Sequence, residues 1–302
     1  MRILICGGSG LIGRELAQAL TGEGHEVWIL TRHPNSPQLA GGARFAAWDG
    51  ITPAGWSQLL DGAGAIINLA GENIGAAPWT ADRLRRIRES RINAGRAIVE
   101  GLKNAHNRPG LLIQQSAIGC YGTSLSQTFD ETAPFGADIL SGICADWEGA
   151  TGPAEDLGMR RIVLRTGLYL TRDGGVLTRL MLPFRLFAGG PLGDGRQWYS
   201  WIHHADWLAA VLFLLSEPDA KGIYNLTAPE PVTNAEFGRT LAWIMRRPYL
   251  LPAPSFALRM ALGKMSSMVL DGQKVVPRRL QEAGFQFKFP KLHAALEDIL
   301  KT

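Results

Sequence analysis

The chain has 302 residues, of which 46% are hydrophobic and 19% are charged, enough for a full core in one large or two closely packed domains. Its 31 basic and 27 acidic residues nearly balance, and its three cysteines (Cys6, Cys120 and Cys144) lack close-paired spacing, which argues against a zinc site or a disulfide framework. Because no apolar run approaches the roughly 18 residues that cross a bilayer and the short apolar start does not fit a signal peptide, we expect a cytoplasmic protein with no membrane partner.

Short β-rich runs alternate with helical patterns through the first half of the chain. We expect strands at residues 2–6, 26–31, 43–48, 65–70, 111–116 and 161–165. Helices are expected at 11–20, 80–106 and 141–157, the second of them capped by Thr80. Strands that alternate with helices build a parallel sheet, so the pattern predicts an α/β fold of the doubly wound Rossmann class.

The alternation breaks down after Thr166. A helix is expected at 205–215, a strand at 222–227, and a capping box at Thr233 and Glu236. The last sixty residues resemble helices broken by glycine and proline. We therefore expect a Rossmann domain at 1–170 plus about 204–228. A smaller substrate-side lobe at 171–203 and 229–302 should pack on the carboxyl edge of the sheet.

A glycine-rich loop at residues 7–13 follows the first strand and opens the first helix. In that context Gly7 permits the tight turn, Gly10 lets the backbone approach a pyrophosphate, and Gly13 lets the helix pack closely on the strand. The helix N-terminus offers free N–H groups to the anion. We expect the cofactor to contact Gly7, Ser9, Gly10, Leu11, Ile12 and Gly13. The G-x-x-G-x-x-G spacing resembles that of the short-chain dehydrogenase/reductase superfamily, particularly its extended, epimerase-like branch.

The second strand ends in Thr31-Arg32, where an NAD-preferring site would place an acidic residue. An arginine pairs with a 2′-phosphate by charge-assisted hydrogen bonds, so Thr31 and Arg32 predict NADP, with help from nearby Arg14 and Ser9. The alternative is that Arg32 is a solvated loop residue. Asp49 matches the position at which relatives hydrogen-bond the adenine, with a plain turn residue as its alternative.

Several further segments together resemble the atypical extended short-chain dehydrogenase/reductases called epimerase-family proteins, which carry a C-terminal domain of unknown function. The segments are 7–13, 68–72, 90–93, 116–122, 164–167, 201–206 and 224–226, and residues 277–287 fit the C-terminal domain. The resemblance implies further cofactor contacts from Leu69, Ala70, Gly71 and Glu72. It also implies an NADP-dependent oxidoreductase or sugar-nucleotide epimerase, although fold analogy alone does not establish chemistry.

The usual catalytic pair of the superfamily is absent. Ordinary members use a tyrosine as proton donor and a lysine four residues later that lowers the tyrosine pKa. Aligning Glu148 to the glutamate that often follows the lysine places Leu140 at the tyrosine position and Cys144 at the lysine position. None of the five tyrosines has a lysine at the fourth residue after it.

Ser116 and Tyr121 remain as candidate catalytic residues. In relatives with an S-S-x-x-x-Y-G run, the serine four residues before the tyrosine is the catalytic one, and that position is Ala117 here. Ser116 lies one residue earlier, and a one-residue shift on a strand turns a side chain to the opposite face. Ser116 therefore reaches the substrate only if the strand ends or bulges there. For both residues a structural role is the alternative.

Other groups could suggest a metal site, a thiol mechanism or nucleic-acid binding, and we favour none of these. His203-His204 is followed by Asp206, but this His-x-Asp spacing lacks a third ligand, and Cys144 is expected to pack as a small hydrophobe. Five arginines crowd the long helix without interleaved aromatic residues, which predicts a solvated face: Arg83, Arg85, Arg86, Arg88 and Arg91.

The second lobe contains residues that could serve a substrate. Three arginines could meet an anionic substrate if the sugar-nucleotide analogy holds: Arg165, Arg179 and Arg185. Trp198, Tyr199 and Trp201 follow a glycine-rich stretch and form either a substrate-side loop or an aromatic core.

Two functions fit these observations. The first is an NADP-dependent enzyme that reduces or isomerises a small molecule with a non-standard proton donor. The second is a non-catalytic NADP(H)-binding sensor or scaffold, since the catalytic pair is missing. The resemblance also allows a homodimer through two long helices.

Overall fold

A parallel sheet of seven strands forms the centre of the computed structural model, which describes residues 1–34 and 42–301. The strands are β1 (Arg2–Cys6), β2 (Glu26–Thr31), β3 (Arg44–Ala47), β4 (Ala65–Asn68), β5 (Leu111–Ala117), β7 (Arg160–Thr166) and β11 (Gly222–Leu226). They lie in the order β11-β7-β5-β4-β1-β2-β3, and every neighbouring pair is parallel. The order reverses between β1 and β4, so the crevice at their carboxyl ends is the place where doubly wound sheets bind ligands.

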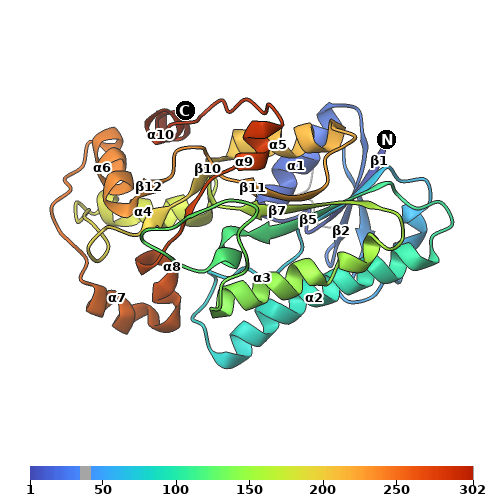
Figure 1. The fold of residues 1–302 in the computed structure, drawn as a ribbon, viewed down its shortest axis with the longest axis horizontal. Helices are drawn as coiled ribbons and strands as arrows, with labels where there is room; N and C mark the ends of the chain where they lie inside the picture. Colours follow the sequence, from blue (N-terminus) through green and yellow to red (C-terminus); the bar gives the residue numbers. More distant parts are fainter. Residues whose placement is uncertain (35–41, 302) are drawn as a thin grey trace.

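Helices cover both faces of this sheet, which confirms the expected Rossmann class. In Figure 1, one face is covered by α1 (Leu11–Gly22), α5 (His204–Ser216) and α9 (Arg278–Glu282), and the other by α2 (Ala81–Asn104) and α3 (Ile139–Gly149). Successive residues of β1 point to opposite faces: Ile3 and Ile5 join the core under α1 and α5, whereas Leu4 and Cys6 join the core over α2. A strand buried on both faces has to be apolar there, which explains the apolar run at residues 3–6 of β1.

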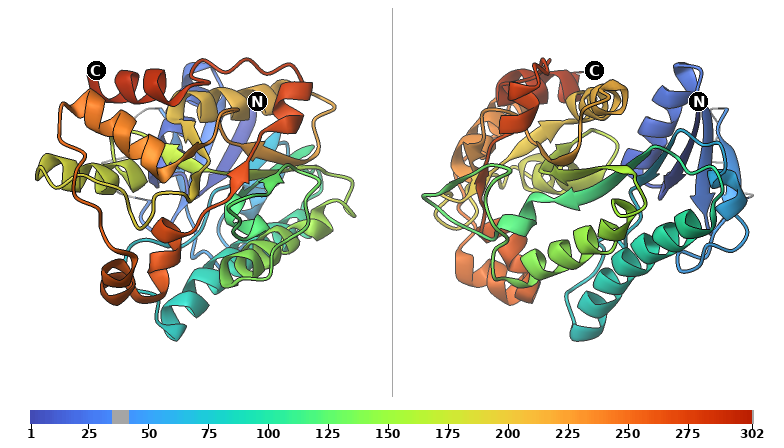
Figure 2. Two further views of the ribbon diagram at one scale, coloured as in Figure 1. Left: turned by 60° about the vertical axis from the view of Figure 1, so that its left-hand side comes forward. Right: turned by 45° about the vertical axis from the view of Figure 1, so that its right-hand side comes forward.

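The remaining elements gather beyond the carboxyl ends of the strands (Figure 1), and the right-hand view of Figure 2 shows most of the orange and red segments on the side away from the blue amino-terminal strands. They are β8 (Leu168–Leu170), α4 (Gly175–Arg185), β9 (Trp198–Tyr199), β10 (Trp201–His203), β12 (Val232–Thr233), α6 (Asn234–Met245), α7 (Ser255–Leu262), η5 (Gly263–Ser266), α8 (Ser267–Leu270) and α10 (Leu292–Lys301). They enclose a core of their own that includes Leu177, Trp201, Phe237 and Leu296. Thr233 and Glu236 form the expected capping box at the start of α6.

The helix expected at 141–157 is divided. α3 ends at Gly149, and a short turn, η4 (Gly152–Ala154), follows it. Pro153 occupies the first turn of η4, and because proline has no N–H to give to a preceding turn, α3 cannot run through it. Two more short turns are η2 (Ser57–Leu60) and η3 (Ile118–Tyr121), and β6 (Thr128–Phe129) pairs with β13 (Lys274–Val275).

The long helix α2 begins where its cap predicts, but two of its arginines correct the expectation of a solvated face. The Thr80 hydroxyl accepts a hydrogen bond from the Arg83 N–H. Arg83 and Arg91 are buried: Arg83 pairs with the Glu72 carboxylate, and Arg91 lies over the Trp147 ring at 4.6 Å. These partners come from other segments, so the helical pattern could not reveal them.

Two of the three aromatic residues near residue 200 form part of an aromatic core, the second of the two expectations. Tyr199 and Trp201 are buried in the core of the second lobe, and Trp198 is half-buried with its indole N–H donated to Leu125 O. In the described part of the chain, no helix combines the length and the apolar character that crossing a membrane requires.

Candidate functional site

The glycine loop has the geometry of a phosphate cradle. Gly7 has a φ of +77°, and a Cβ on it would lie 2.8 Å from the backbone carbonyl of Leu69. A Cβ on Gly13 would lie 2.5 Å from Gly7 O and 2.6 Å from Gly8 Cα, a distance at which no side chain fits. Gly13 therefore lets the start of α1 pack tightly against the end of β1, and Gly7 lets the loop pack against the segment after β4.

The amino terminus of α1 is open to an anion. Its N-cap is Gly10, which has no side chain to occupy the free N–H groups, and the first turn contains no acidic residue. Ser9 and Gly10 are exposed, and Leu11 and Ile12 are half-buried. The unpaired N–H groups and the positive end of the helix dipole therefore face outward, as a bound phosphate requires.

The end of β2 lies next to this loop, because a Cβ on Gly8 would meet the Ile29 side chain at 2.9 Å. Thr31 is buried and its hydroxyl accepts a hydrogen bond from the His33 N–H. Arg32 and, in the first turn of α1, Arg14 are exposed, and neither has a polar partner within residues 1–34 and 42–301. Both cations are therefore available to a ligand at the β1–β2 edge of the loop.

Asp49 closes a turn beside the end of β2. Its carboxylate accepts hydrogen bonds of 2.8 Å from the N–H groups of Ile51 and Thr52, and Trp48 N–H donates to Thr31 O at 2.9 Å. The side chain thus has the turn role that its sequence also allowed, and it remains exposed at the rim of the site.

The segment after β4 approaches the cradle with its backbone. Backbone atoms of Leu69 and Ala70 lie nearest to a Cβ built on Gly7. The glycine loop and the segment after β4 therefore form one edge of the crevice. The Glu72 carboxylate, in contrast, pairs with Arg83, and the backbone carbonyl oxygen of Glu72 accepts a hydrogen bond from Arg91. The Glu72 side chain is therefore held by α2, and the contact of residues 69–72 with a cofactor stays a prediction.

The positions of the missing catalytic pair are apolar. Leu140 packs with Ile74 and Met265 in a small cluster between the two lobes. Cys144 is buried, and its thiol lies 3.8 Å from Ala117 O. Burial raises the pKa of Cys144 to about 11, so the thiol stays protonated and packs as expected. Neither position offers a proton donor near neutral pH.

Ser116 and Tyr121 both donate their hydroxyl protons inside the protein. Ser116 is fully buried, and its hydroxyl donates to Glu148 Oε1 at 2.6 Å. Tyr121 is buried, its hydroxyl donates to Asn225 Oδ1 at 2.7 Å, and burial raises its pKa. Their catalytic role stays a prediction, and each would have to break an internal hydrogen bond to fulfil it.

The position of Arg165 contradicts the expectation that this residue meets an anionic substrate. Only 2% of the residue is exposed, because its guanidinium forms two hydrogen bonds of 2.9 and 3.0 Å to the Glu148 carboxylate. The guanidinium also lies between the rings of Tyr121 and Phe135, at 4.9 and 4.8 Å. The buried ion pair of Arg165 and Glu148, with Ser116 bonded to it, thus links β7, α3 and β5 (Leu111–Ala117).

The histidine pair belongs to a polar cluster that ties α1 to α5. His204 Nδ1 lies 2.5 Å from Glu15 Oε1, and Tyr169 donates to the other oxygen at 2.6 Å. His203 Nδ1 accepts the Ala205 N–H, so in the neutral ring Nε2 carries the proton and has no lone pair for a metal. Desolvation lowers the pKa of His203 to about 4, which keeps that ring neutral.

The third possible ligand beside the two histidines is Asp298, whose carboxylate lies 3.3 Å from His203 Nε2. Sequence spacing had pointed to Asp206, whose carboxylate instead accepts the N–H groups of Lys288 and Phe289 at 2.8 and 2.9 Å. Asp206 therefore fastens the C-terminal segment to α5.

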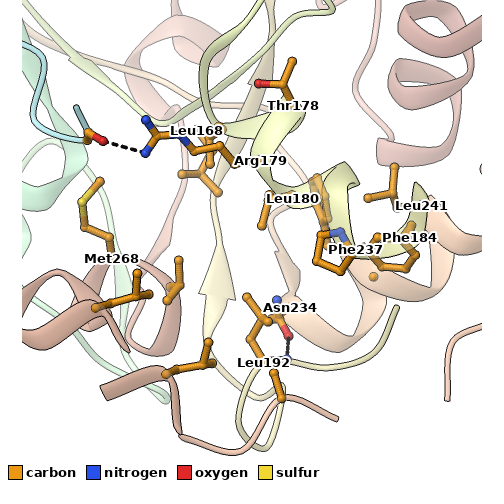
Figure 3. A pocket seen from close by; sticks show the side chains of 18 of the residues that line it. Leu168, Thr178, Arg179, Leu180, Phe184, Leu192, Asn234, Phe237, Leu241 and Met268 are labelled. Atoms are coloured by element: carbon orange, nitrogen blue, oxygen red, sulfur yellow. Dashed lines mark hydrogen bonds between the residues drawn. The ribbon is translucent and has the colours of Figure 1, made fainter. Parts of the chain in front are cut away.

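A cavity of about 670 Å³ opens between the second lobe and the segment after β4 (Figure 3). Its walls are mostly apolar and include Leu180, Phe184, Phe237, Leu241, Leu258 and Met268. Gly175 lies on its wall, and a Cβ on Gly175 would meet Leu11 at 3.5 Å. Arg179 lies at one end and donates to Gly75 O at 2.7 Å. The cavity therefore adjoins the phosphate cradle.

Of the three arginines considered for an anionic substrate, Arg179 alone lines this cavity. The cavity could not be predicted from the sequence, because its walls come from segments between residues 73 and 269 that only the fold brings together.

Comparisons with known proteins agree with this geometry. A family model described as the NAD dependent epimerase/dehydratase family matches residues 3–227, and a model for a domain of unknown function (DUF1731) matches residues 253–299. The chain is 38% identical to "Epimerase family protein SDR39U1 homolog, chloroplastic" of Arabidopsis thaliana, covering 100% of this chain and 87% of the relative. It is 39% identical to "Epimerase family protein SA0724" of Staphylococcus aureus, covering 99% and 98%.

Among solved structures, the human epimerase family protein SDR39U1 (isoform 2) with NADPH superposes with a TM-score of 0.90 at 34% identity, over 100% of both chains. A UDP-glucose 4-epimerase of Thermotoga maritima with UDP-glucose superposes with a TM-score of 0.78, over 100% and 98% of the two chains. At 18% identity that second likeness shows the fold alone.

Proposed function

Because the chain belongs to the NAD dependent epimerase/dehydratase family, we propose that it is an oxidoreductase that uses NADP(H) on a small molecule bound in the cavity. The observation that carries the proposal is the phosphate cradle with an open cavity beside it. Gly7 and Gly13 leave no room for side chains, while Gly10 leaves the start of α1 uncovered. The related human protein was solved with NADPH, which supports the same nucleotide here.

The choice of NADP over NAD rests on the two unpaired arginines. A 2′-phosphate adds negative charge to the adenine ribose, and Arg32 follows β2 where that ribose lies in Rossmann proteins. Arg14 adds a second cation without a polar partner among the described residues. No acidic residue follows β2 directly to repel the phosphate, since residues 32–34 are Arg, His and Pro.

When bound, the nicotinamide supplies or accepts a hydride. The residues of this chain hold the two reactants: the cradle fixes the nucleotide, and the cavity walls position the second reactant beside it. Reduction of a carbonyl also needs a proton on the oxygen. Because Leu140 and Cys144 offer none, and Ser116 and Tyr121 donate theirs internally, we propose that the proton comes from water.

A titration of the purified chain with NADPH and with NADH, followed by cofactor fluorescence, tests the proposal. We expect NADPH to bind at least tenfold more tightly than NADH, and Arg32→Ala to remove most of this preference, since a charge-assisted pair is lost. Arg96→Ala removes the same charge from an exposed position on α2 and should change nothing. Equal affinity for both nucleotides in the wild type would contradict the assignment of NADP.

The second candidate function is a non-catalytic NADP(H) sensor, favoured by the apolar residues at the catalytic positions. A sensor must bind NADPH and NADP⁺ with different affinity, because only a difference can report the redox state. Equal affinities would exclude the sensor. Turnover of NADPH with any member of a broad carbonyl panel would support the enzyme, and the absence of turnover across that panel would count against it.

A further inference from the structure

The cavity differs in chemistry from a site for a sugar nucleotide. Its walls are built mainly from leucine, phenylalanine, methionine and valine side chains, and Arg179 is the one charged residue among its lining residues in the described chain. A nucleoside diphosphate presents two phosphate charges and a polar base. Burying these groups against aliphatic walls without partners is strongly unfavourable.

Three polar side chains on the walls each have one oxygen engaged with the backbone. Asn234 Oδ1 accepts the Leu192 N–H at 2.9 Å, and Thr178 donates to Gly175 O at 3.1 Å. Asn73 Oδ1 accepts the Gly75 N–H at 2.9 Å. These bonds shape the backbone around the cavity, and the remaining amide groups of Asn73 and Asn234 add no charge to its mainly apolar walls.

Arg179 is the exception. One guanidinium nitrogen donates to Gly75 O at 2.7 Å, and within the described residues its other N–H groups have no acceptor. Arg179 projects from α4 at the end of the cavity nearest the segment after β4, as Figure 3 shows. A guanidinium held by one bond and free on its other edge suits a single carboxylate or similar anion.

The C-terminal domain supplies one apolar wall. Leu258 and Leu262 of α7 and Met265 and Met268 beyond it line the cavity. None of the residues of α7 is fully buried. The side of this helix that lines the cavity therefore becomes buried only when a ligand fills the cavity. A cavity of about 670 Å³ falls in the size range of small-molecule sites.

We infer that the cavity binds an apolar molecule with one anionic group, the apolar part against α4, α6 and α7 and the anionic group on Arg179. That this ligand is the substrate rests on the proposed function. The matched C-terminal domain of unknown function then has a defined task, since it forms the wall that selects an apolar substrate over a sugar nucleotide.

Calorimetric titrations of the full chain with decanoate, 1-decanol and UDP-glucose, each with and without NADP⁺, test the inference. We expect saturable binding of decanoate, binding of 1-decanol about tenfold weaker, and none of UDP-glucose. Arg179→Met should remove the preference for decanoate over 1-decanol and leave 1-decanol unchanged. Hydrogen exchange of residues 255–270 should slow when decanoate binds.

Two tryptophan variants on α4 locate the binding. Leu180 lines the cavity, whereas Leu182 is 55% exposed and lies outside it. Leu180→Trp should weaken decanoate binding at least tenfold, and Leu182→Trp should leave it unchanged. Tighter binding of UDP-glucose than of decanoate, no saturable binding of decanoate, or decanoate binding that ignores Leu180→Trp would each overturn the inference. Because binding is measured without turnover and also without NADP⁺, failure of the proposed NADP function would show separately.

Discussion

The contact between α1 and β1 makes Gly13→Ala the most informative single change. The new Cβ would lie 2.5 Å from Gly7 O and 2.6 Å from Gly8 Cα, whereas ordinary contacts begin near 3.4 Å. About 0.9 Å must therefore be absorbed by moving the start of α1 away from the loop. Forced overpacking of this kind costs about 1–3 kcal/mol, and it displaces the N–H groups that face the phosphates.

Gly22→Ala is the matched control, because it lies in the same helix and its Cβ would meet nothing within 4 Å. Alanine is favoured over glycine in a helix by up to about 1 kcal/mol, so this variant should be slightly more stable and bind NADPH normally. We expect Gly13→Ala to lower the thermal unfolding temperature and to weaken NADPH binding at least tenfold in a fluorescence titration. Unchanged stability and affinity in Gly13→Ala would refute the close-packing argument.

Three further predictions concern ionisable groups. Glu148→Ala leaves the Arg165 cation without its partner and should cost about 3–5 kcal/mol in denaturant unfolding; a loss below 1 kcal/mol would show that the pair is dispensable. Burial raises the pKa of Cys144 to about 11, so a disulfide reagent at pH 8 should modify it only after unfolding, and rapid modification of the native protein would contradict its burial. The Glu15 hydrogen bond raises the pKa of His204, so the contribution of the pair to stability is full below the ordinary histidine pKa near 6.5 and is lost as pH rises through the raised value. The pair also contributes less to stability in acid. Burial acts to raise the pKa of Glu15, but the hydrogen bonds from His204 and Tyr169 outweigh burial and lower that pKa. The contribution therefore falls as the pH drops below about 4.5. The stability difference between wild type and His204→Gln should thus be larger at pH 5.5 than at pH 8.5, and a difference independent of pH would contradict the pairing.

Local patterns in the sequence predicted much of the fold. The strands β1 and β2 (Glu26–Thr31) have the expected bounds, and Thr80 and Thr233 cap the helices that they were expected to cap. Each of these features depends on residues a few positions apart, such as an apolar run or a threonine three residues before a glutamate. The glycine loop belongs to the same class, since the strand, the turn and the helix follow directly in the chain.

The features that sequence reasoning missed depend on contacts between distant segments. Arg83 and Arg91 looked solvated because their partners, Glu72 and Trp147, lie on other elements. Glu148 served only to align a helix, yet it neutralises Arg165 in the core. The cavity is likewise a product of tertiary structure, so its apolar chemistry could not be read from any one motif.

The most direct test of the central claim is a crystal structure of the chain with NADP⁺. We predict that the pyrophosphate lies against the N–H groups of Leu11 and Ile12, and that the 2′-phosphate lies within hydrogen-bonding distance of Arg32. We also predict that the nicotinamide ring faces the cavity next to Arg179. A nucleotide bound away from the glycine loop, or a 2′-phosphate directed away from Arg32, would contradict the account.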